Sequence, residues 1–245
     1  MTEVKTMKTT LLVLTLNEIE GLKLILPRVN RDWVDEIVAV DGGSTDGTIE
    51  YLKKNGIRIV NQKSKGVCGA YWEGFEAATG DVIIPFSPDN NSLPELIPAL
   101  VAKMKQGYDM VIASRYLDGA KSYDDDPVTA LGNWMFTKSV NLCFGAKFTD
   151  TLVMFRAFRK DILDRLGMDE KKRPVFEMQL CIRCAKQGLR VAEIPADEPK
   201  RIGGVRKMRP LYNGSTLAWQ LVKEMFIRRS NGAGGANAAS GSRNA

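Results

Sequence analysis

Residues 80–98 read GDVIIPFSPDNNSLPELIP, and this stretch indicates how the rest of the chain is organised. The apolar run at residues 82–86 predicts a buried strand, and Pro94 is typical of the first turn of a helix. The polar turn between them carries one acidic residue, Asp89. A carboxylate at the carboxyl end of a central strand can hold a hard divalent cation, which prefers oxygen ligands. Because Asp, Asn, Ser and Pro also make ordinary surface turns, Asp89 alone does not decide between a metal ligand and a turn residue.

Strands and helices alternate through the first half of the chain. This alternation with short links predicts right-handed crossovers and a mainly parallel sheet with helices on both faces. Asn17 and Glu20 have the spacing of a capping box, and Ser44 or Thr45 can cap the helix that follows them. The expected strands are residues 9–15, 36–40, 57–60, 82–86 and 109–113. The expected helices are one that begins at Asn17 and then residues 49–54, 70–78 and 94–105.

Polar residues lie at or directly after the ends of these strands. They are Asn17, Glu18, Asp41, Lys63, Asp89 and Arg115. In a parallel sheet all strands end at the same edge, where ligands bind. The fold would therefore bring these residues together in one cleft, which is the main sequence argument for a functional site.

The second half of the chain is less regular. The expected helices are residues 127–144, 161–166, 175–186 and 215–229, and the expected strands are residues 153–158 and 190–194. The helix at residues 215–229 is amphipathic, so it would either pack on the domain or a second subunit, or lie on a membrane surface. We expect one domain over residues 1–229, with halves at 8–114 and 115–210 and the helix in its last part, 211–229. Residues 230–245 are poor in apolar side chains and are expected to be disordered.

The composition limits which side chains can transfer protons or bind a metal. The chain contains no histidine, so proton transfer and metal binding must fall to carboxylates. The net charge of +6 is unevenly distributed, with a basic stretch, KRIGGVRKMR, at residues 200–209. This stretch is too short and too lacking in aromatic residues for a nucleic-acid-binding site, and it suits phosphate or an anionic membrane surface better. No apolar run approaches the roughly 18 residues of a membrane span, and the start MTEVKTMKTT lacks the apolar core of a signal peptide. We therefore expect a cytoplasmic protein.

Eight motifs follow one another along the chain. They are TLNE (15–18), DGGSTDGT (41–48), KGVCGAYWEGFEAATGD (65–81), SPDNNSLPELIP (87–98), ASRY (113–116), FRAFRKDIL (155–163), FEMQ (176–179) and RIGGVRK (201–207). In this order they resemble the family 2 glycosyltransferases of the GT-A fold, most closely the dolichyl-phosphate mannose synthase group. Each motif alone is weak, but the series is specific. The resemblance implies an α/β fold with a Rossmann-like, mainly parallel sheet and a short amphipathic helix at its end.

The resemblance also implies a donor pocket. Thr15, Asn17, Glu18 and Asp41 would line the pocket for the base and ribose of a nucleotide, since a carboxylate accepts charge-assisted hydrogen bonds. Asn17 can serve as a helix cap as well. The remaining donor-side residues are Gly43, Lys63, Ser87 and Gln179.

A metal site is implied by the family's DXD motif. Asp89 matches the second acid of that motif, and Asn91 matches the glutamine two residues further on, so these two would hold Mg²⁺ or Mn²⁺. The first acid of the motif is Ser87 here and its middle residue is Pro88. One carboxylate fewer means weaker metal binding, with the donor diphosphate supplying more of the ligands.

The acceptor side is cationic by the same resemblance. Arg115, Arg156, Arg201 and Lys207 match the family's basic residues and would bind a lipid phosphate or the leaving diphosphate. In the alternative interpretation, Arg115 and Arg156 make structural ion pairs with Asp150 or Glu177. The sequence departs from the family at DTLVMFR, residues 150–156, and lacks an arginine near residues 129–131.

The resemblance implies an inverting enzyme that moves a hexose from GDP-mannose or UDP-glucose to a polyprenyl or dolichyl phosphate. A hydroxyl acceptor is the first alternative, and it would need a base, for which Asp150 and then Glu177 are the candidates. A non-catalytic nucleotide-sugar-binding protein is the second. Nucleotidyltransferases and dehydrogenases are disfavoured because LTLNEIEGL, residues 14–22, has no clustered glycines. The donor base, the sugar and any oligomer remain open.

Overall fold

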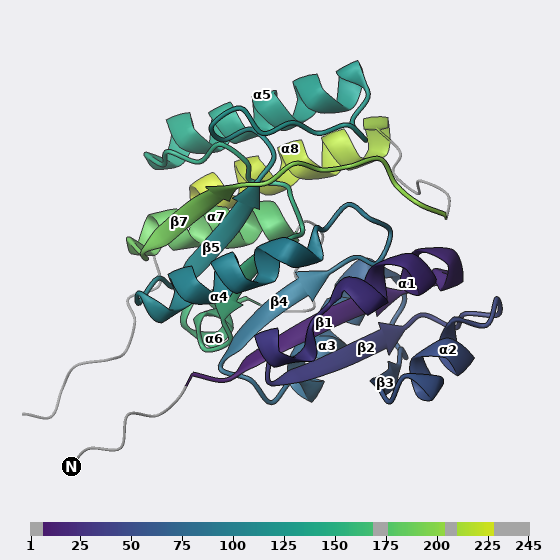
Figure 1. Cartoon of the computed structure of the whole chain (residues 1–245). Helices are drawn as coiled ribbons and strands as arrows, with labels where there is room; N and C mark the ends of the chain where they lie inside the picture. The colour runs from purple at the N-terminus through teal and green to yellow at the C-terminus, as the bar shows by residue number, and fades with distance from the viewer. Residues whose placement is uncertain (1–6, 169–175, 204–209, 228–245) are drawn as a thin grey trace, which may run out of the picture.

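A computed structural model of the chain describes residues 7–168, 176–203 and 210–227 (Figure 1). These residues form a seven-stranded sheet in the order β3-β2-β1-β4-β6-β5-β7. The strands are β1 (Thr9–Thr15), β2 (Glu36–Asp41), β3 (Arg58–Asn61), β4 (Val82–Phe86), β5 (Met110–Ser114), β6 (Arg156–Arg159) and β7 (Val191–Pro195). The helices are α1 (Ile19–Ile25), α2 (Thr48–Lys54), α3 (Gly66–Ala77), α4 (Ile97–Lys105), α5 (Pro127–Phe144), α6 (Ile162–Arg165), α7 (Phe176–Gln187) and α8 (Pro210–Phe226).

The sheet is mainly parallel, as predicted. β1 pairs in parallel with β2 and β4, β2 with β3, and β5 with β7. Only β6 runs antiparallel in the described sheet, between β4 and β5. Every residue of β4 and β5 is buried, because these inner strands are covered by helices on both faces. The carboxyl ends of β1, β2, β4 and β5 consequently lie at the same edge of the sheet.

Helices cover both faces of the sheet. In Figure 1, α1 and α4 lie in front of the strands, and α3 and α7 lie behind them. Four aromatic side chains hold α3 and α7 to β6, with neighbouring ring centroids 4.9 to 5.7 Å apart: Tyr71, Phe75, Phe158 and Phe176. Burial of one such ring contributes about 1.5–3 kcal/mol, so this cluster is a main attachment between the layers.

A further layer lies outside the sheet. α5 and α8 pack on α7 through a second apolar cluster, which contains Phe136, Val140, Met178, Ile182, Leu217 and Leu221 (Figure 1). The helix expected at residues 215–229 is therefore present as α8 and packs on the domain, which was one of the two placements considered. No helix in the described ranges combines the length and apolar character needed to cross a membrane.

Several element boundaries differ from expectation, for local reasons. β6 begins at Arg156 rather than residue 153, because the Asp150 carboxylate accepts the N–H groups of Leu152 and Val153 and holds them in a turn. α8 begins at Pro210, earlier than expected, since proline is favoured in the first turn of a helix. The tail expected to be disordered lies outside the described residues. The division of residues 1–229 into two halves stays a prediction.

Candidate functional site

Asp41 organises the loop that follows β2. Its carboxylate is buried, and each of its oxygens accepts two hydrogen bonds. Oδ1 accepts the N–H groups of Gly43 and Ser44 at 2.9 and 2.8 Å, and Oδ2 accepts the hydroxyls of Thr15 and Ser44 at 2.9 and 2.6 Å. Gly43 has a positive φ of 95° and open space beside its Cα, so the backbone is accessible there. The Asp41 carboxylate thus ties β1 to the glycine turn.

Asn17 joins this loop instead of capping α1. It takes a left-handed backbone with φ 58°, which asparagine tolerates, and its Oδ1 accepts the N–H of Thr45 at 2.8 Å. The Asn17 N–H donates to the Ser44 hydroxyl at 2.8 Å. The predicted capping box is therefore wrong: α1 has Glu18 at its N-cap and no side-chain cap bond there.

The backbone N–H groups at the start of α1 find their acceptors in the loop that follows β2. Asp46 accepts the Ile19 N–H, and the Thr48 hydroxyl accepts the Glu18 N–H. Although burial raises it, hydrogen bonds from Thr48 and Ile19 hold the pKa of Asp46 below its ordinary value. Asp46 also accepts the Thr48 N–H at the start of α2, so the prediction that Ser44 or Thr45 caps this helix is wrong. The loops after β1 and β2 form one hydrogen-bonded unit that includes Thr15, Asn17, Glu18, Asp41 and Gly43.

Asp89 lies in the turn after β4, against α1. Gly21 of α1 permits this contact, because a Cβ there would stand 2.4 Å from the Pro88 carbonyl oxygen. The buried Asp89 carboxylate accepts the Asn91 N–H at 3.2 Å and forms an ion pair with Arg201 at 3.1 Å. The Ile202 N–H donates to the Asp89 carbonyl, which fixes the segment of Arg201 over the turn.

Asn91 connects this turn to two further acids. Its Nδ2 donates to Asp124 at 3.0 Å and to Glu198 at 3.2 Å. Two carboxylates on one side fix the orientation of the amide, since only the nitrogen can donate. Asn91 Oδ1 is left buried without a hydrogen-bond partner among the described residues. It is an oxygen of the type that a hard cation binds.

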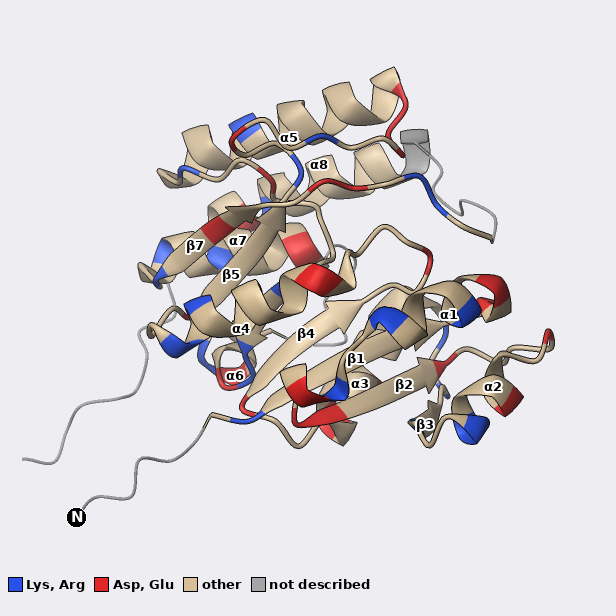
Figure 2. Cartoon of the chain, viewed as in Figure 1, with Lys and Arg blue, Asp and Glu red and all other residues tan. Residues whose placement is uncertain are grey.

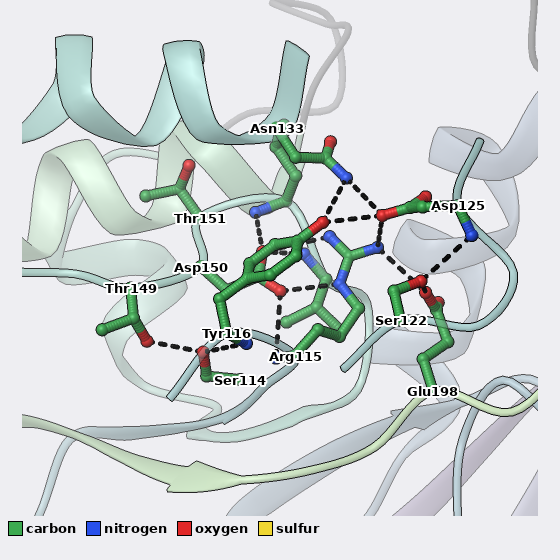
Figure 3. Close-up of polar contacts among 12 residues, drawn as sticks. Ser114, Arg115, Tyr116, Ser122, Asp125, Asn133, Thr149, Asp150, Thr151 and Glu198 are labelled. Carbon is green, nitrogen blue, oxygen red and sulfur yellow. Dashed lines mark hydrogen bonds and ion pairs between the residues drawn. The ribbon is translucent and has the colours of Figure 1, made fainter. Parts of the chain in front are cut away.

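Arg115 is the centre of a buried ionic network (Figure 3). Its Nε and Nη2 donate to the two oxygens of Asp150 at 2.7 and 3.1 Å, and Nη1 donates to Glu198 at 3.2 Å. Nη1 also lies 3.5 Å from Asp125. Burial opposes both charges, yet the pairing lowers the pKa of Asp150 and raises the pKa of Arg115. The structural ion pair between Arg115 and Asp150, one of the two interpretations of the sequence, is confirmed.

Neutral side chains complete the network. The Tyr116 hydroxyl donates to Asp125 at 2.6 Å, and Asn133 of α5 donates to the same carboxylate at 2.9 Å. The Ser122 hydroxyl donates to Glu198 (Figure 3). Because Glu198 also contacts Asn91, the network runs without a break from Asp150 to the turn of Asp89.

Arg156 and Glu177 lie elsewhere, Arg156 in the core and Glu177 in the first turn of α7. Arg156 has no exposed surface and donates to the carbonyls of Val153 and Glu177 and to the sulfur of Cys181. The Glu177 carboxylate accepts the Tyr71 hydroxyl at 2.6 Å. Arg156 is thus enclosed by protein, whereas Glu177 is half-buried.

Of the remaining predicted residues, Ser87 begins the turn of Asp89, whereas Gln179 lies on α7 and Lys63 follows β3. Gln179 is buried on α7 and donates to Glu224 of α8 at 3.0 Å, which serves the packing of these helices. The backbone N–H groups of Lys63 and Ser87 bond to Glu73 and Ser92, respectively. Lys207 lies outside the described residues.

Sequence reasoning missed six polar residues of the network. They are Tyr116, Ser122, Asp124, Asp125, Asn133 and Glu198. The run of acids at residues 124–126 was a signal, but Glu198 carries none, because it follows β7 without a motif of its own. Among the described residues no group of three or more His, Cys, Asp or Glu side chains has the arrangement of a metal site.

Comparison with known proteins agrees with this geometry. The glycosyl transferase family 2 model matches residues 10–167. An undecaprenyl-phosphate mannosyltransferase of Micrococcus luteus is 30% identical over 215 residues, which cover 82% of this chain and 88% of the relative. A dolichyl-phosphate hexose transferase of Haloferax volcanii is 28% identical over 217 residues, which cover 88% of this chain and 92% of the relative.

A solved structure shows the same fold. Glucosyl-3-phosphoglycerate synthase from Mycobacterium tuberculosis, in complex with Mn²⁺, UDP and phosphoglyceric acid, superposes with a TM-score of 0.66. The two are 20% identical, and the match covers 91% of this chain and 80% of the synthase. The sheet order, the matched motifs and these similarities lead to one assignment: the chain is a glycosyltransferase of the GT-A fold and belongs to glycosyl transferase family 2.

Proposed function

We propose that the chain transfers a hexose from a nucleotide-sugar to a polyprenyl phosphate. The observation that carries this proposal is the Asp89–Arg201 pair at the carboxyl end of β4. It places a carboxylate that can bind a cation beside a guanidinium that can bind phosphate. The activities named for the Micrococcus luteus and Haloferax volcanii relatives support a hexose and a lipid phosphate.

The residues present fit a Mg²⁺ or Mn²⁺ ion. Asp89 offers a carboxylate and Asn91 offers an amide oxygen that lacks a partner. The connected side chains carry five negative charges against two positive ones: Asp89, Asp124, Asp125, Asp150 and Glu198 against Arg115 and Arg201. This excess favours a cation. When bound, the metal would neutralise charge on the donor diphosphate.

Arg201 would change partner during the reaction. It is about a quarter exposed, whereas Arg115 is buried among carboxylates. Once Asp89 turns to the cation, the Arg201 guanidinium becomes available for a phosphate, which it can bind through two parallel hydrogen bonds. We therefore assign Arg201 to the acceptor phosphate and Arg115 to the positioning of Asp150 and Glu198.

The acceptor's chemistry suits a chain without histidine. An oxygen of the lipid phosphate attacks the anomeric carbon, and the bond from that carbon to the diphosphate breaks, with its electron pair leaving on the nucleoside diphosphate. Displacement in one step inverts the configuration at the anomeric carbon. The attacking oxygen is already anionic, so no residue has to remove a proton.

A hydroxyl acceptor is the second candidate, and the geometry disfavours it. Such an acceptor needs a general base within hydrogen-bond reach. Asp150 is enclosed, bonded to Arg115 and held at a lowered pKa, and the half-buried Glu177 carboxylate already accepts the Tyr71 hydroxyl. Neither carboxylate is free to accept a proton from a substrate.

The identity of the donor and the cellular location are part of the proposal. GDP-mannose and UDP-glucose are the two donors to compare, and Thr15, Asn17, Glu18 and Asp41 would line the nucleotide pocket. The cytoplasmic location expected from the sequence is retained, with the reaction at a membrane surface.

The decisive experiment is a radiolabelled transfer assay. Each donor is offered separately with Mg²⁺ or Mn²⁺, with and without a polyprenyl phosphate, and the lipid extract is counted. We expect lipid-bound label with one donor and a loss of at least 100-fold in Asp89→Ala, with an unchanged circular dichroism spectrum. Asp161→Ala is the control. This exposed acid follows β6, which runs antiparallel to β4 and β5, so it lies at the edge of the sheet opposite the candidate site.

Arg201→Ala separates acceptor from donor. It should raise the KM for the lipid phosphate at least 10-fold more than the KM for the nucleotide-sugar. Equal losses would place Arg201 on the leaving diphosphate. Nucleotide binding by the unmodified chain without lipid-bound label would overturn the proposed function in favour of a hydroxyl acceptor or a non-catalytic role.

A further inference from the structure

Arg201 lies between two carboxylates. Its Nη2 forms an ion pair with Asp89 at 3.1 Å, and its Nε lies 3.9 Å from a carboxylate oxygen of Asp124. The second distance is too long for a hydrogen bond. Arg201 Nε is buried and has no hydrogen-bond partner among the described residues. The guanidinium is thus paired with Asp89, while Asp124 is the nearby acid toward which its Nε can turn.

The backbone that carries this arginine is held on both sides. The Arg201 N–H donates to Asp124 Oδ1 at 3.1 Å, and the Ile202 N–H donates to the Asp89 carbonyl at 2.8 Å. Figure 2 shows the basic segment beside the acidic loop that precedes α5. Because the main chain is bonded to both acidic loops, Arg201 can exchange one carboxylate for the other by rotation of its side chain alone.

The Asp124 carboxylate also contacts the candidate cation site. While Oδ1 accepts the Arg201 N–H, Oδ2 accepts the amide nitrogen of Asn91 at 3.0 Å. This bond turns the Asn91 nitrogen toward the acid and leaves the amide oxygen for a cation, since only the nitrogen can donate. One carboxylate therefore touches both the candidate cation ligand and the candidate phosphate ligand.

The charges favour an exchange of partners. Asp89 and Asp124 carry two negative charges, and the guanidinium of Arg201 between them carries one positive charge. A divalent cation on Asp89 would compete with the guanidinium for the same carboxylate and repel it. Asp124 and Arg201 would then form a neutral pair, so neither charge is left without compensation when the cation binds.

We propose that Asp124 is a positioning residue that couples cation binding to phosphate binding. Arg201 occupies Asp89 and so opposes the binding of a cation there. When a cation takes Asp89, Asp124 receives the guanidinium and holds it where its remaining N–H groups bind the acceptor phosphate. A phosphate that draws Arg201 away from Asp89 strengthens cation binding in turn, because coupling between two ligands is reciprocal. The inference rests on the proposed function, which assigns these two ligands to the site.

A manganese titration of the full chain tests the competition. Free Mn²⁺ is followed by electron paramagnetic resonance, and Arg201→Ala should bind Mn²⁺ about 5-fold more tightly than the wild-type chain, because loss of a partly exposed ion pair frees Asp89. Unchanged or weaker Mn²⁺ binding by Arg201→Ala overturns the proposal.

The same titration with a short, water-soluble prenyl phosphate tests the coupling. The phosphate should tighten Mn²⁺ binding by the wild-type chain about 5-fold and should have no such effect on Arg201→Ala. A titration without protein corrects for Mn²⁺ that the phosphate binds directly. Equal tightening in both proteins would show that Arg201 does not carry the coupling, and it overturns the proposal.

Asp124→Asn tests the positioning role. The variant keeps the shape of the side chain but removes the charge that receives Arg201. The affinities for Mn²⁺ and, in the presence of Mn²⁺, for the prenyl phosphate should each fall about 5-fold. Asp118→Asn is the matched control, because it removes one exposed charge from the same loop, and asparagine tolerates the left-handed backbone there, with φ 49°. Equal changes in the two variants overturn the proposal.

A double mutant distinguishes positioning from a general structural effect. If Asp124 acts on the phosphate through Arg201, then Asp124→Asn should not weaken phosphate binding, measured by calorimetry, once Arg201→Ala is present. Equal weakening in both backgrounds would show a merely structural role and overturn the proposal. Melting temperatures confirm that the compared proteins are folded, and the titration of Arg201→Ala decides the competition without any substitution at Asp124.

These binding measurements do not depend on transfer. If the wild-type chain labels no lipid but shows the expected changes in Mn²⁺ affinity, the proposed function fails and the coupling stands. If transfer occurs and the prenyl phosphate leaves the Mn²⁺ affinity of the wild-type chain unchanged, the coupling fails and the proposed function stands.

Discussion

Two polar networks at the same edge of the sheet differ in how they are built. Around Asp41, one carboxylate is held mostly by neighbours in sequence, Gly43 and Ser44, two and three residues away, and by the Thr15 hydroxyl, 26 residues away. Around Arg115, a guanidinium is held by Asp150 and Glu198, which lie 35 and 83 residues away. The first network shapes a turn, and the second joins the loops after β5, α5 and β7.

The difference concerns energy as well as distance. Neutral donors at a partly exposed loop can be replaced by water at modest cost. Ions buried among protein atoms cannot, because loss of one partner leaves a charge with too little compensation. The Arg115 network should therefore dominate stability, and the Asp41 network should affect mainly the geometry of the donor loop.

The largest expected effect is from Asp150→Ala. Removal of this carboxylate takes the bidentate partner from buried Arg115, and we expect a loss of about 3 kcal/mol in the free energy of unfolding, near the lower end for a broken buried pair because Glu198 remains. Urea denaturation followed by circular dichroism measures it. Asp161→Ala is the matched control: its 3.5 Å pair with Arg165 is exposed, so it should cost less than about 0.5 kcal/mol. Similar losses in both variants would show that the buried Arg115 network does not dominate stability.

A smaller effect is expected from Asp41→Ala. The variant leaves the Thr15 hydroxyl and the N–H groups of Gly43 and Ser44 without their acceptor, at a cost of about 1–2 kcal/mol because water can reach part of the loop. Nucleotide affinity, measured by calorimetry with UDP and GDP, should fall more clearly than stability. Asp41→Asn keeps one acceptor oxygen, so its losses of stability and of nucleotide affinity should be about half those of Asp41→Ala. A stability loss equal to that of Asp150→Ala would contradict the comparison.

The close approach of α1 to the turn of Asp89 can be tested by substitution of two glycines. Gly21→Ala places a methyl group 2.4 Å from the Pro88 carbonyl, so the turn of Asp89 must move, at a cost of about 1–3 kcal/mol. Gly132→Ala, on α5, meets no atom within 4 Å and should stabilise by about 0.5–1 kcal/mol, as alanine in a helix normally does. Thermal and urea unfolding measure the change in the free energy of unfolding, and its sign, for each variant. Stabilisation by Gly21→Ala would show that the turn does not depend on this close approach.

Much of the fold was predictable because it depends on local patterns. The apolar runs of β1, β2, β4 and β5 were placed within one residue of their observed ends. α5 was predicted with its observed bounds, and the structure shows the local signals that set them: Asp126 caps the start before Pro127, and Gly145 ends the helix in a left-handed conformation. The predicted cap at Asn17 was wrong because a residue from a distant loop, Asp46, satisfied the helix start instead.

The candidate site was predictable only in part. Strand ends identified Asn17, Asp41, Asp89 and Arg115, because parallel strands end at one edge whatever follows them. The pairing of Arg115 was left between two interpretations, since sequence shows which residues are charged but not which charges are buried together. Glu198 was not found at all, although it contacts both Arg115 and Asn91.

The sequence by itself determined the α/β class, the order of the strands along the chain and the family of the enzyme, because periodicity, turn residues and motifs are properties of short segments. Only the tertiary structure decided which polar groups share a buried network, that Arg156 lies in the core, and that α5 keeps an apolar row exposed. The physical reason is that burial and pairing depend on segments far apart in the chain. A side chain's partners exist only after the sheet and its helices have packed.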